Sequence, residues 1–388
     1  MAFANSSLEF KFVYVKIEVP SIEHGTPMKS LTAILACLLC LSLMTTEVVS
    51  KTTRILFLAG GRSHASGHHE FNAGCLLLAK ALNEQSGLDV EATVIQGWPK
   101  DESVFKDVDA VIIYSDATKV VSKGWEKMDK LVKSGMGVMF MHYAVHPSPE
   151  NGEKYFRPWI GAAMETGYSV NPHWVADLRA MPEHPISNGV PDTVEAYDEF
   201  YYSMRFQKDR GKVLDLVTAM PTKQRIKRII NLWNENGENG VDKDQSLMWG
   251  VEREDGGRGV GFVGGHYHRN WANDGFRQIA LNAIAWVAGM EVPKGGVVSN
   301  PLTEDELNAN LDVYPGKENR RIPLPDIEEF KKMAPAKWVT GKGHAAAKEA
   351  ARKARIKKNR EKKAEAKKKA EMKKKAEMKK AKELESAK

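Results

Sequence analysis

The sequence contains little cysteine, with only three in 388 residues. Cys37 and Cys40 lie in an apolar segment near the amino terminus, which leaves Cys75 alone in the part of the chain able to build a core. A small secreted fold held together by disulfides is therefore excluded. Two catalytic patterns are also absent, the G-x-S-x-G nucleophile elbow and the H-E-x-x-H zinc motif.

Long apolar runs are absent as well. The apolar segment Leu31–Met44 is too short to cross a bilayer comfortably and has the length of a signal-peptide core. Small residues ending at Ser50 suit a cleavage site. We expect residues 1–27 to be a leader upstream of the true start, residues 28–50 a signal peptide, and the mature protein to be exported, periplasmic or secreted. An uncleaved anchor is the alternative, and the apolar stretch before Cys37 is too short for a lipoprotein.

The carboxyl-terminal residues 341–388 lack an apolar stripe and therefore cannot build a core. They contain 20 Lys and Arg against 7 Asp and Glu, whereas the preceding 340 residues contain 37 and 43. The net charge of +7 thus averages a mildly acidic folded part and a basic low-complexity tail. The tail either only solubilises the protein or binds an anionic envelope surface. Nucleic acid is the least natural partner of an exported protein.

Continuous apolar runs alternate with helical periodicity in the first half of the chain. We expect strands at 54–60, 90–95, 110–114 and 137–142, and helices at 71–85 and 125–133. The second half predicts a Pro-rich loop region over 156–191, strands near 194–197, 213–219, 247–251 and 260–263, and a last helix over 274–290. This pattern indicates an α/β fold with a mostly parallel sheet and helices on both faces. We expect a single domain over 51–295 and a surface extension over 296–340.

Histidines and acids gather where the expected strands end. The clusters are GGRSHASGHHEF with His64, His68 and His69, MHYAVH with His142 and His146, NPHW with His173, DEFYY with Asp198 and Glu199, and GGHYH with His266 and His268. Ligands of open α/β sheets bind at the carboxyl ends of the strands. Imidazole suits both proton transfer near neutral pH and the binding of Zn, Fe or Mn. The sequence therefore predicts one polar pocket at this edge of the sheet.

A nucleophile is missing where comparable folds carry one. His142 ends the fourth strand, at the position where an α/β hydrolase or an amidotransferase places Ser or Cys. Cys75 lies within a helical apolar run, which is typical of a packed thiol. Nucleophilic acyl chemistry is therefore not expected.

An ordered series of segments resembles the ThuA-like (trehalose utilisation) family, a branch of the class I glutamine amidotransferase-like superfamily. The segments are RILFLAGGRSH, HEFNAG, GVMFMHYA, HPISNGVPDTVEAYDEFYY, GRGVGFVGGHYHRNW and IALNAIAWVAGME, within residues 53–292. The resemblance implies a flavodoxin-like sheet, catabolism of disaccharides through 3-keto intermediates, and no amidotransferase activity. The charged segment 223–244 is an insertion relative to the shorter family pattern. We expect it to reshape the mouth of the pocket.

The resemblance also implies which residues build the pocket. They are His64, His69, His142, Glu199 and His266, with His173 and Trp271 at the rim. Beside these, Tyr143 and His268, in the same clusters, are expected to contact the substrate. One divalent metal held by His69, His142 and His266 would polarise a substrate carbonyl, and Glu199, His64 or His266 would move protons. Acid–base chemistry without a metal is the open alternative.

Three functions are compatible with these residues. The leading hypothesis is an exported isomerase, lyase or hydrolase that acts on a keto-sugar or glycoside. The alternative is a non-catalytic carbohydrate-binding protein, anchored by its tail, with Trp159, Trp174 and Trp271 as sugar platforms. A structural protein with a vestigial pocket is the third. A homo-oligomer is compatible with each of them.

Overall fold

The computed structural model describes residues 51–314 and 321–338, followed by 340–343, 346, 349–350, 352–354, 356–361, 364–365 and 369. The expected leader, signal peptide and cleavage site, and much of the basic tail, lie outside the described residues. In the part of the chain that is described, no helix is both long and apolar enough to cross a membrane.

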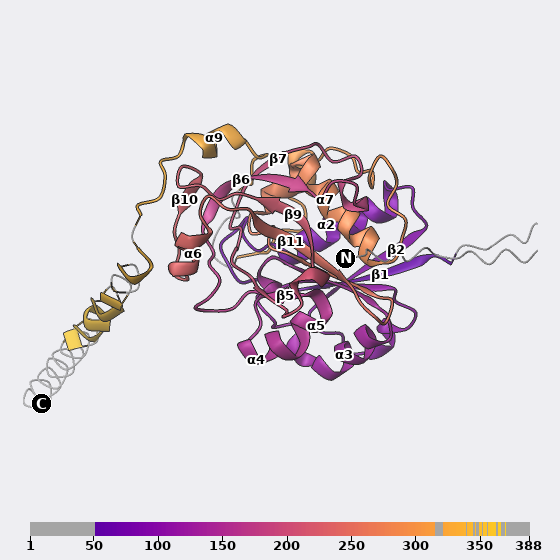
Figure 1. Cartoon of the computed structure of the whole chain (residues 1–388), viewed down its shortest axis with the longest axis horizontal. Coiled ribbons are helices and arrows are strands. Elements are labelled where there is room, and N and C mark those ends of the chain that lie inside the picture. Colours follow the sequence, from indigo (N-terminus) through magenta and orange to yellow (C-terminus); the bar gives the residue numbers. More distant parts are fainter. Residues whose placement is uncertain are drawn as a thin grey trace, which may run out of the picture. The chain divides into compact units, whose positions relative to one another are not determined.

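Parallel strands form the centre of the main sheet, in the order β2-β1-β3-β4-β12 (Figure 1). They are β1 (Thr53–Ala59), β2 (Val90–Gln96), β3 (Ala110–Tyr114), β4 (Gly137–Met141) and β12 (Arg258–Phe262). Every residue of β3 and β4 is buried, as the apolar runs predict for strands covered on both faces. The predicted α/β fold is confirmed, and the strand order is flavodoxin-like.

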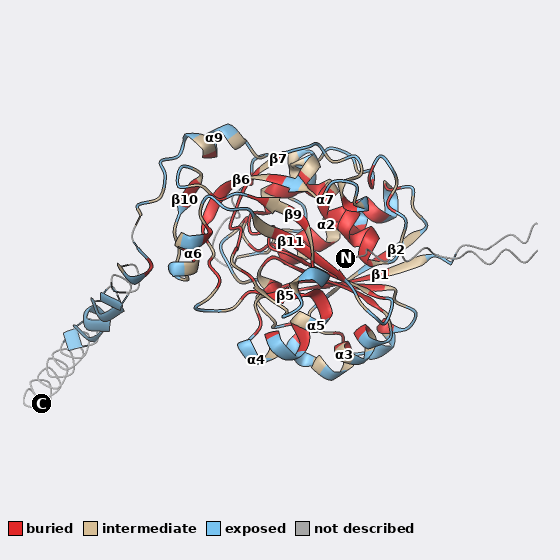
Figure 2. Cartoon of the chain, in the orientation of Figure 1, coloured by how far each residue is buried: buried red, intermediate tan, exposed pale blue. Residues whose placement is uncertain are grey.

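Helices pack on both faces of these strands. Figure 1 shows α2 (Phe71–Glu84) and α7 (Asp274–Val287) on one side and α3 (Trp125–Lys133) and α5 (Arg157–Ile160) on the other. Helix α2 contacts β1 and β2, whereas α5 contacts β4, β11 and β12. The apolar side chains of α2 and α7 face the sheet, which Figure 2 shows as a buried centre inside a more exposed outer surface.

An antiparallel extension continues the sheet beyond β12, in the order β11-β9-β6-β10, with β7 also paired to β6. These strands are β6 (His173–Ala180), β7 (Val194–Asp198), β9 (Leu214–Ala219), β10 (Ile226–Arg228) and β11 (Gln245–Glu252). The expected strands of the second half are present. The expected loop region over 156–191 is wrong for β6, because its prolines flank the strand instead of interrupting the hydrogen-bond ladder.

Short elements complete the described residues. They are a small sheet of β5 (Ala162–Ala163) with β8 (Arg205–Phe206), the helices α4 (Pro149–Asn151), α6 (Glu235–Gly240), α8 (Glu304–Leu307) and α9 (Ile327–Lys332), the 3-10 turns η1 (Glu102–Phe105), η2 (Val121–Lys123), η3 (His142–Val145), η5 (Pro185–Ser187), η6 (Arg210–Lys212) and η7 (His268–Ala272), and the π-helical η4 (Gly152–Phe156).

Residues 302–314 and 321–338, which we call the strap, return across the domain. Leu307 and Phe330 of the strap are buried, with 0% and 8% exposure. The Nε2 atom of the fully buried His268 lies 3.0 Å from the Leu307 carbonyl oxygen. The Nζ atom of Lys227 donates to the Met333 carbonyl at 2.9 Å. The strap therefore shares both apolar and polar contacts with the domain.

The burial of His268 makes stability depend on pH. Burial lowers the pKa of His268 to about 4, against about 6.5 in an unfolded chain. Between these values the unfolded state binds more protons, so stability falls as pH falls. A His268→Gln variant keeps an N–H donor and does not titrate. Urea unfolding should show that the free energy of unfolding of wild type falls by about 2 kcal/mol more than that of this variant between pH 7 and pH 5.

Asn308→Ala is the matched control, because it removes strap hydrogen bonds without removing a titrating group. It should lower stability equally at both pH values. Identical pH dependence of wild type and His268→Gln would show that folding does not lower the pKa of His268.

Candidate functional site

The carboxyl ends of the parallel strands bring three histidines together. His142 follows β4 directly, His266 lies four residues after β12, and His69 ends the loop that follows β1. Glu199 joins them from the end of β7 in the antiparallel extension. We call these four residues the His3Glu cluster.

A cavity of about 580 Å³ opens onto the cluster. We call it the histidine pocket, and its size falls within the range of about 300–1,000 Å³ typical of small-molecule sites. Among the predicted site residues, those that line it are His64, His69, Tyr143, His173, Glu199 and His266. His142 is fully buried and contacts His69 and Tyr201.

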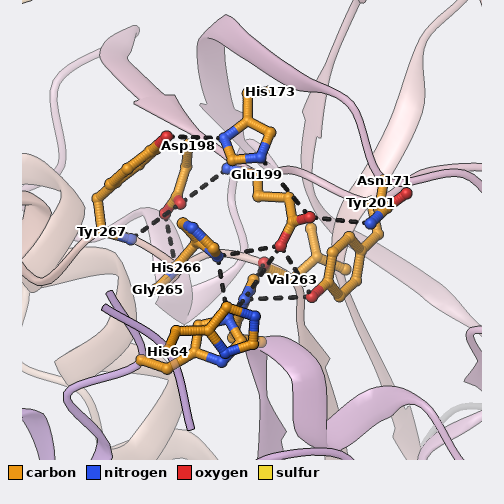
Figure 3. Close-up of polar contacts among 12 residues, drawn as sticks. His64, Asn171, His173, Asp198, Glu199, Tyr201, Val263, Gly265, His266 and Tyr267 are labelled. Carbon is orange, nitrogen blue, oxygen red and sulfur yellow. Dashed lines mark hydrogen bonds and ion pairs between the residues drawn. The ribbon is translucent and has the colours of Figure 1, made fainter. Parts of the chain in front are cut away.

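The cluster atoms lie at close range. His69 Nε2 is 2.9 Å from His142 Nε2 and 3.0 Å from His266 Nδ1. Glu199 Oε2 lies 3.0 Å from His266 Nδ1 (Figure 3). It lies 3.6 Å from His142 Nε2. One potential ligand atom from each of the four residues therefore lies within 4.8 Å of all the others.

Backbone conformation helps to aim two of these side chains. His69 has φ of 54° and His142 has φ of 51°, a left-handed region that non-glycine residues adopt at some cost in energy. The amide of His69 donates to the His266 carbonyl at 3.0 Å, and His142 Nδ1 donates to the Val263 carbonyl at 2.9 Å. The second bond leaves the lone pair of His142 Nε2 facing the cluster.

Burial determines the charge of the cluster. Desolvation lowers the pKa of His142 to about 3, and it also lowers the pKa values of His69 and His266. Desolvation raises the pKa of Glu199. The imidazoles are therefore neutral at physiological pH, which is the form that binds metals.

Asp198 fixes the position of the loop that carries His266. Its carboxylate accepts hydrogen bonds from the amides of Gly265 at 2.7 Å and Tyr267 at 3.2 Å (Figure 3). It also accepts from the side chain of Asn270 at 3.0 Å. Asp198 also accepts from the amide of Glu199 at 2.8 Å. The two adjacent acids thus have different roles, since Asp198 holds the backbone and Glu199 faces the pocket.

Two neutral side chains outside the His3Glu cluster also donate hydrogen bonds to the Glu199 carboxylate. Asn171 Nδ2 donates to Glu199 Oε1 at 2.8 Å, and the Tyr201 hydroxyl donates to Oε2 at 3.3 Å. His173 Nε2 lies 3.7 Å from Oε1, while His173 Nδ1 is 2.8 Å from the Tyr267 hydroxyl (Figure 3). The carboxylate orientation is therefore set from several sides.

The strap holds the loop that carries His64 and His69. Glu70 accepts hydrogen bonds from the amides of Gly67 at 2.8 Å and Asp312 at 2.7 Å. The Tyr314 hydroxyl donates to the His64 carbonyl. The loop between β1 and α2 is therefore bonded to a segment more than two hundred residues away in sequence.

Two predicted substrate contacts lie outside the pocket. His268 and Trp271 are both 0% exposed. The turn η7 begins at His268, the last residue of GGHYH, so His268 contacts Leu307 and Trp271 packs against Tyr114 and Phe276. The prediction that placed them at the pocket is wrong, because the turn directs both side chains into the core.

The predicted sugar platforms also lie in the core. Trp159 is 2% exposed and Trp174 is 0% exposed. The indole of Trp159 donates to Asp129 at 3.1 Å, and that of Trp174 donates to the Phe200 carbonyl at 2.9 Å. Neither ring has a face available for a sugar.

Sequence reasoning missed several residues of the pocket wall. They are Asn171, Tyr201 and Arg228, whereas His68 and His146, which belong to the histidine clusters of the sequence, also line the pocket. The second half of DEFYY was an available signal for Tyr201. Asn171 and Arg228 carried no such signal, since they reach the pocket only through the pairing of β6 with β7 and β10.

The role of Glu70 can be tested by Glu70→Gln. This change replaces one accepting oxygen with an N–H₂ donor, so one of the Gly67 and Asp312 amides loses its partner at a cost of about 1–3 kcal/mol. Faster hydrogen exchange at Gly67 and a lower Tm should follow. Glu306→Gln, in an exposed capping box of α8, is the control and should leave Gly67 unchanged. Unaltered exchange at Gly67 in Glu70→Gln would contradict this role.

Comparison with solved structures finds ThuA-like proteins. One from Bacteroides uniformis ATCC 8492 has 17% identity and a TM-score of 0.45, covering 62% of this chain and 92% of its own. One from Parabacteroides merdae ATCC 43184 has 20% identity and a TM-score of 0.44, covering 63% and 93%. PurLQS from Thermotoga maritima has 12% identity and a TM-score of 0.30, covering 60% and 100%.

No curated protein matches the sequence. The family model described as ThuA, trehalose utilisation, matches residues 54–287, which is more than half of the chain and confirms the resemblance seen in the sequence. This chain belongs to the ThuA family.

Proposed function

We propose that this protein is an enzyme of sugar metabolism that acts on a keto-sugar or glycoside and holds a divalent metal, Zn, Mn or Fe, in its histidine pocket. The observation that carries the proposal is the buried His3Glu cluster, with one potential ligand atom from each residue within 4.8 Å of the others. Family membership supports the sugar-related role.

The cluster fits a metal in both chemistry and spacing. Nitrogen ligands lie about 2.0–2.1 Å from zinc, so neighbouring ligands of a tetrahedral site are roughly 3.3 Å apart. His69, His142 and His266 show nitrogen separations of 2.9 and 3.0 Å around His69 Nε2. If His69 Nε2 carries a proton, that single proton must be shared between the lone pairs of His142 Nε2 and His266 Nδ1. A metal cation instead binds the lone pairs of all three nitrogens.

A bound metal of this kind supplies a Lewis acid that polarises a substrate carbonyl. Burial raises the pKa of Glu199, which makes its carboxylate a stronger base than one in water. In isomerisation, Glu199 would take a proton from the carbon beside the carbonyl and return it to the neighbouring carbon. In elimination, the proton would pass to the leaving oxygen. His64 at the exposed mouth and His173 in the wall are the candidates to relay it.

The alternative of a non-catalytic carbohydrate-binding protein has less support, because its expected tryptophan platforms are buried. Export after cleavage near Ser50 is part of the proposal and is supported by the apolar segment Leu31–Met44. Attachment of the basic tail to an anionic envelope surface is supported by its composition.

Metal content of the full chain tests the ligand set. Mass spectrometry should find near-stoichiometric metal in wild type and a loss in His142→Ala and His266→Ala, because each variant removes a ligand. His146→Ala is the control, since this pocket histidine contacts Thr166 and not the cluster. Wild type without metal after incubation with Zn, Mn and Fe(II), or equal loss in His146→Ala, would reject the ligand set.

Turnover of 3-keto-glycosides tests the reaction. At saturating metal, Glu199→Gln should lower kcat about 10²- to 10⁴-fold, because the amide cannot take a proton. Circular dichroism should show an unchanged fold. Equal turnover by wild type and Glu199→Gln would remove Glu199 from the reaction.

A further inference from the structure

The charged segment 223–244 contributes basic residues near the pocket, and most of them are engaged elsewhere. Lys223 lies over the ring of Trp338 at 5.5 Å. Arg225 forms an ion pair with Asp177. The Nζ atom of Lys227 is bonded to backbone carbonyl oxygens. These three cations stabilise the local fold.

Arg228 differs from its neighbours. It is the exposed last residue of β10 and it lines the histidine pocket. Among the described residues, no side chain or carbonyl forms an ion pair or hydrogen bond with its guanidinium. The pairing of β10 with β6 shifts register between Ile226 and Arg228, opposite Trp174 and His173. Such an irregularity re-aims a side chain, and here it accompanies an arginine at the pocket wall.

The pocket does not supply a counter-charge for this arginine. Glu199 is the only carboxylate among the described residues that line it. Its Oε2 faces His266 Nδ1 at 3.0 Å and its Oε1 accepts from Asn171 at 2.8 Å. Both oxygens are therefore occupied, and the pocket presents a fixed positive charge to whatever enters it.

We propose that Arg228 forms an anion subsite and that the sugar substrate carries a carboxylate or phosphate group. The inference rests on the proposed sugar-binding function of this pocket. A guanidinium offers a planar fork of donors that matches a carboxylate or phosphate in a two-point contact. A neutral sugar would leave that charge without a partner, whereas an acidic sugar engages both Arg228 and the pocket.

The test measures binding to the full chain after metal removal by a chelator, so that an acid cannot bind through a metal. Isothermal titration compares D-glucuronate and glucose 6-phosphate with glucose. Wild type should bind one of the two acids about 10- to 100-fold more tightly than glucose. Arg228→Gln should abolish this preference, and Arg228→Lys should restore only part of it. Arg225→Gln, the matched control three residues earlier, should retain it.

The acid that is preferred identifies the anionic group. Equal affinity for glucose and both acids, no binding of either acid, or an equal loss in Arg225→Gln would overturn the subsite. Metal content is measured separately on untreated protein. Metal without an acid preference rejects only the subsite, and an acid preference without metal rejects only the metal proposal.

Discussion

The site depends on placing three imidazoles and a carboxylate in contact where all four are buried. Burial keeps the imidazoles neutral, as the pKa of about 3 for His142 indicates, so their lone pairs face one another and Glu199. Burying polar groups is costly unless each has a partner. A shared cation is the simplest partner for such a set, and its binding energy would contribute to folding. The other features of the pocket follow from the need to hold these groups in place.

The scaffold meets this need with contacts from separate parts of the chain. The parallel sheet fixes the strand ends that deliver His142 and His266, and left-handed backbone conformations aim His69 and His142. Asp198 holds the loop of His266, while the strap holds the loop of His69 through Glu70. The antiparallel extension adds Glu199 and the wall that carries Arg228. The wall of the pocket that carries Asn171, His173 and Arg228 is therefore built by the antiparallel extension.

Much of the core could be predicted from the sequence, because a fully buried strand is a continuous apolar run and the histidines follow such runs directly. The antiparallel half was harder, since β6 is framed by prolines and its partners are distant in sequence. Side-chain direction after a strand was the weakest inference. Adjacent Asp198 and Glu199 have different partners, whereas the turn that begins at His268 carries His268 and Trp271 into the core. Arg228 reaches the pocket through the pairing of β10 with β6, and such pairing leaves no pattern in the local sequence.

Anomalous diffraction from a crystal of the full chain loaded with zinc tests the central claim most directly. One strong peak is expected in contact with His69 Nε2, His142 Nε2 and His266 Nδ1, with Glu199 beside it. A zinc-loaded crystal with no peak there, or with its strongest peak at other histidines of the pocket, would contradict it.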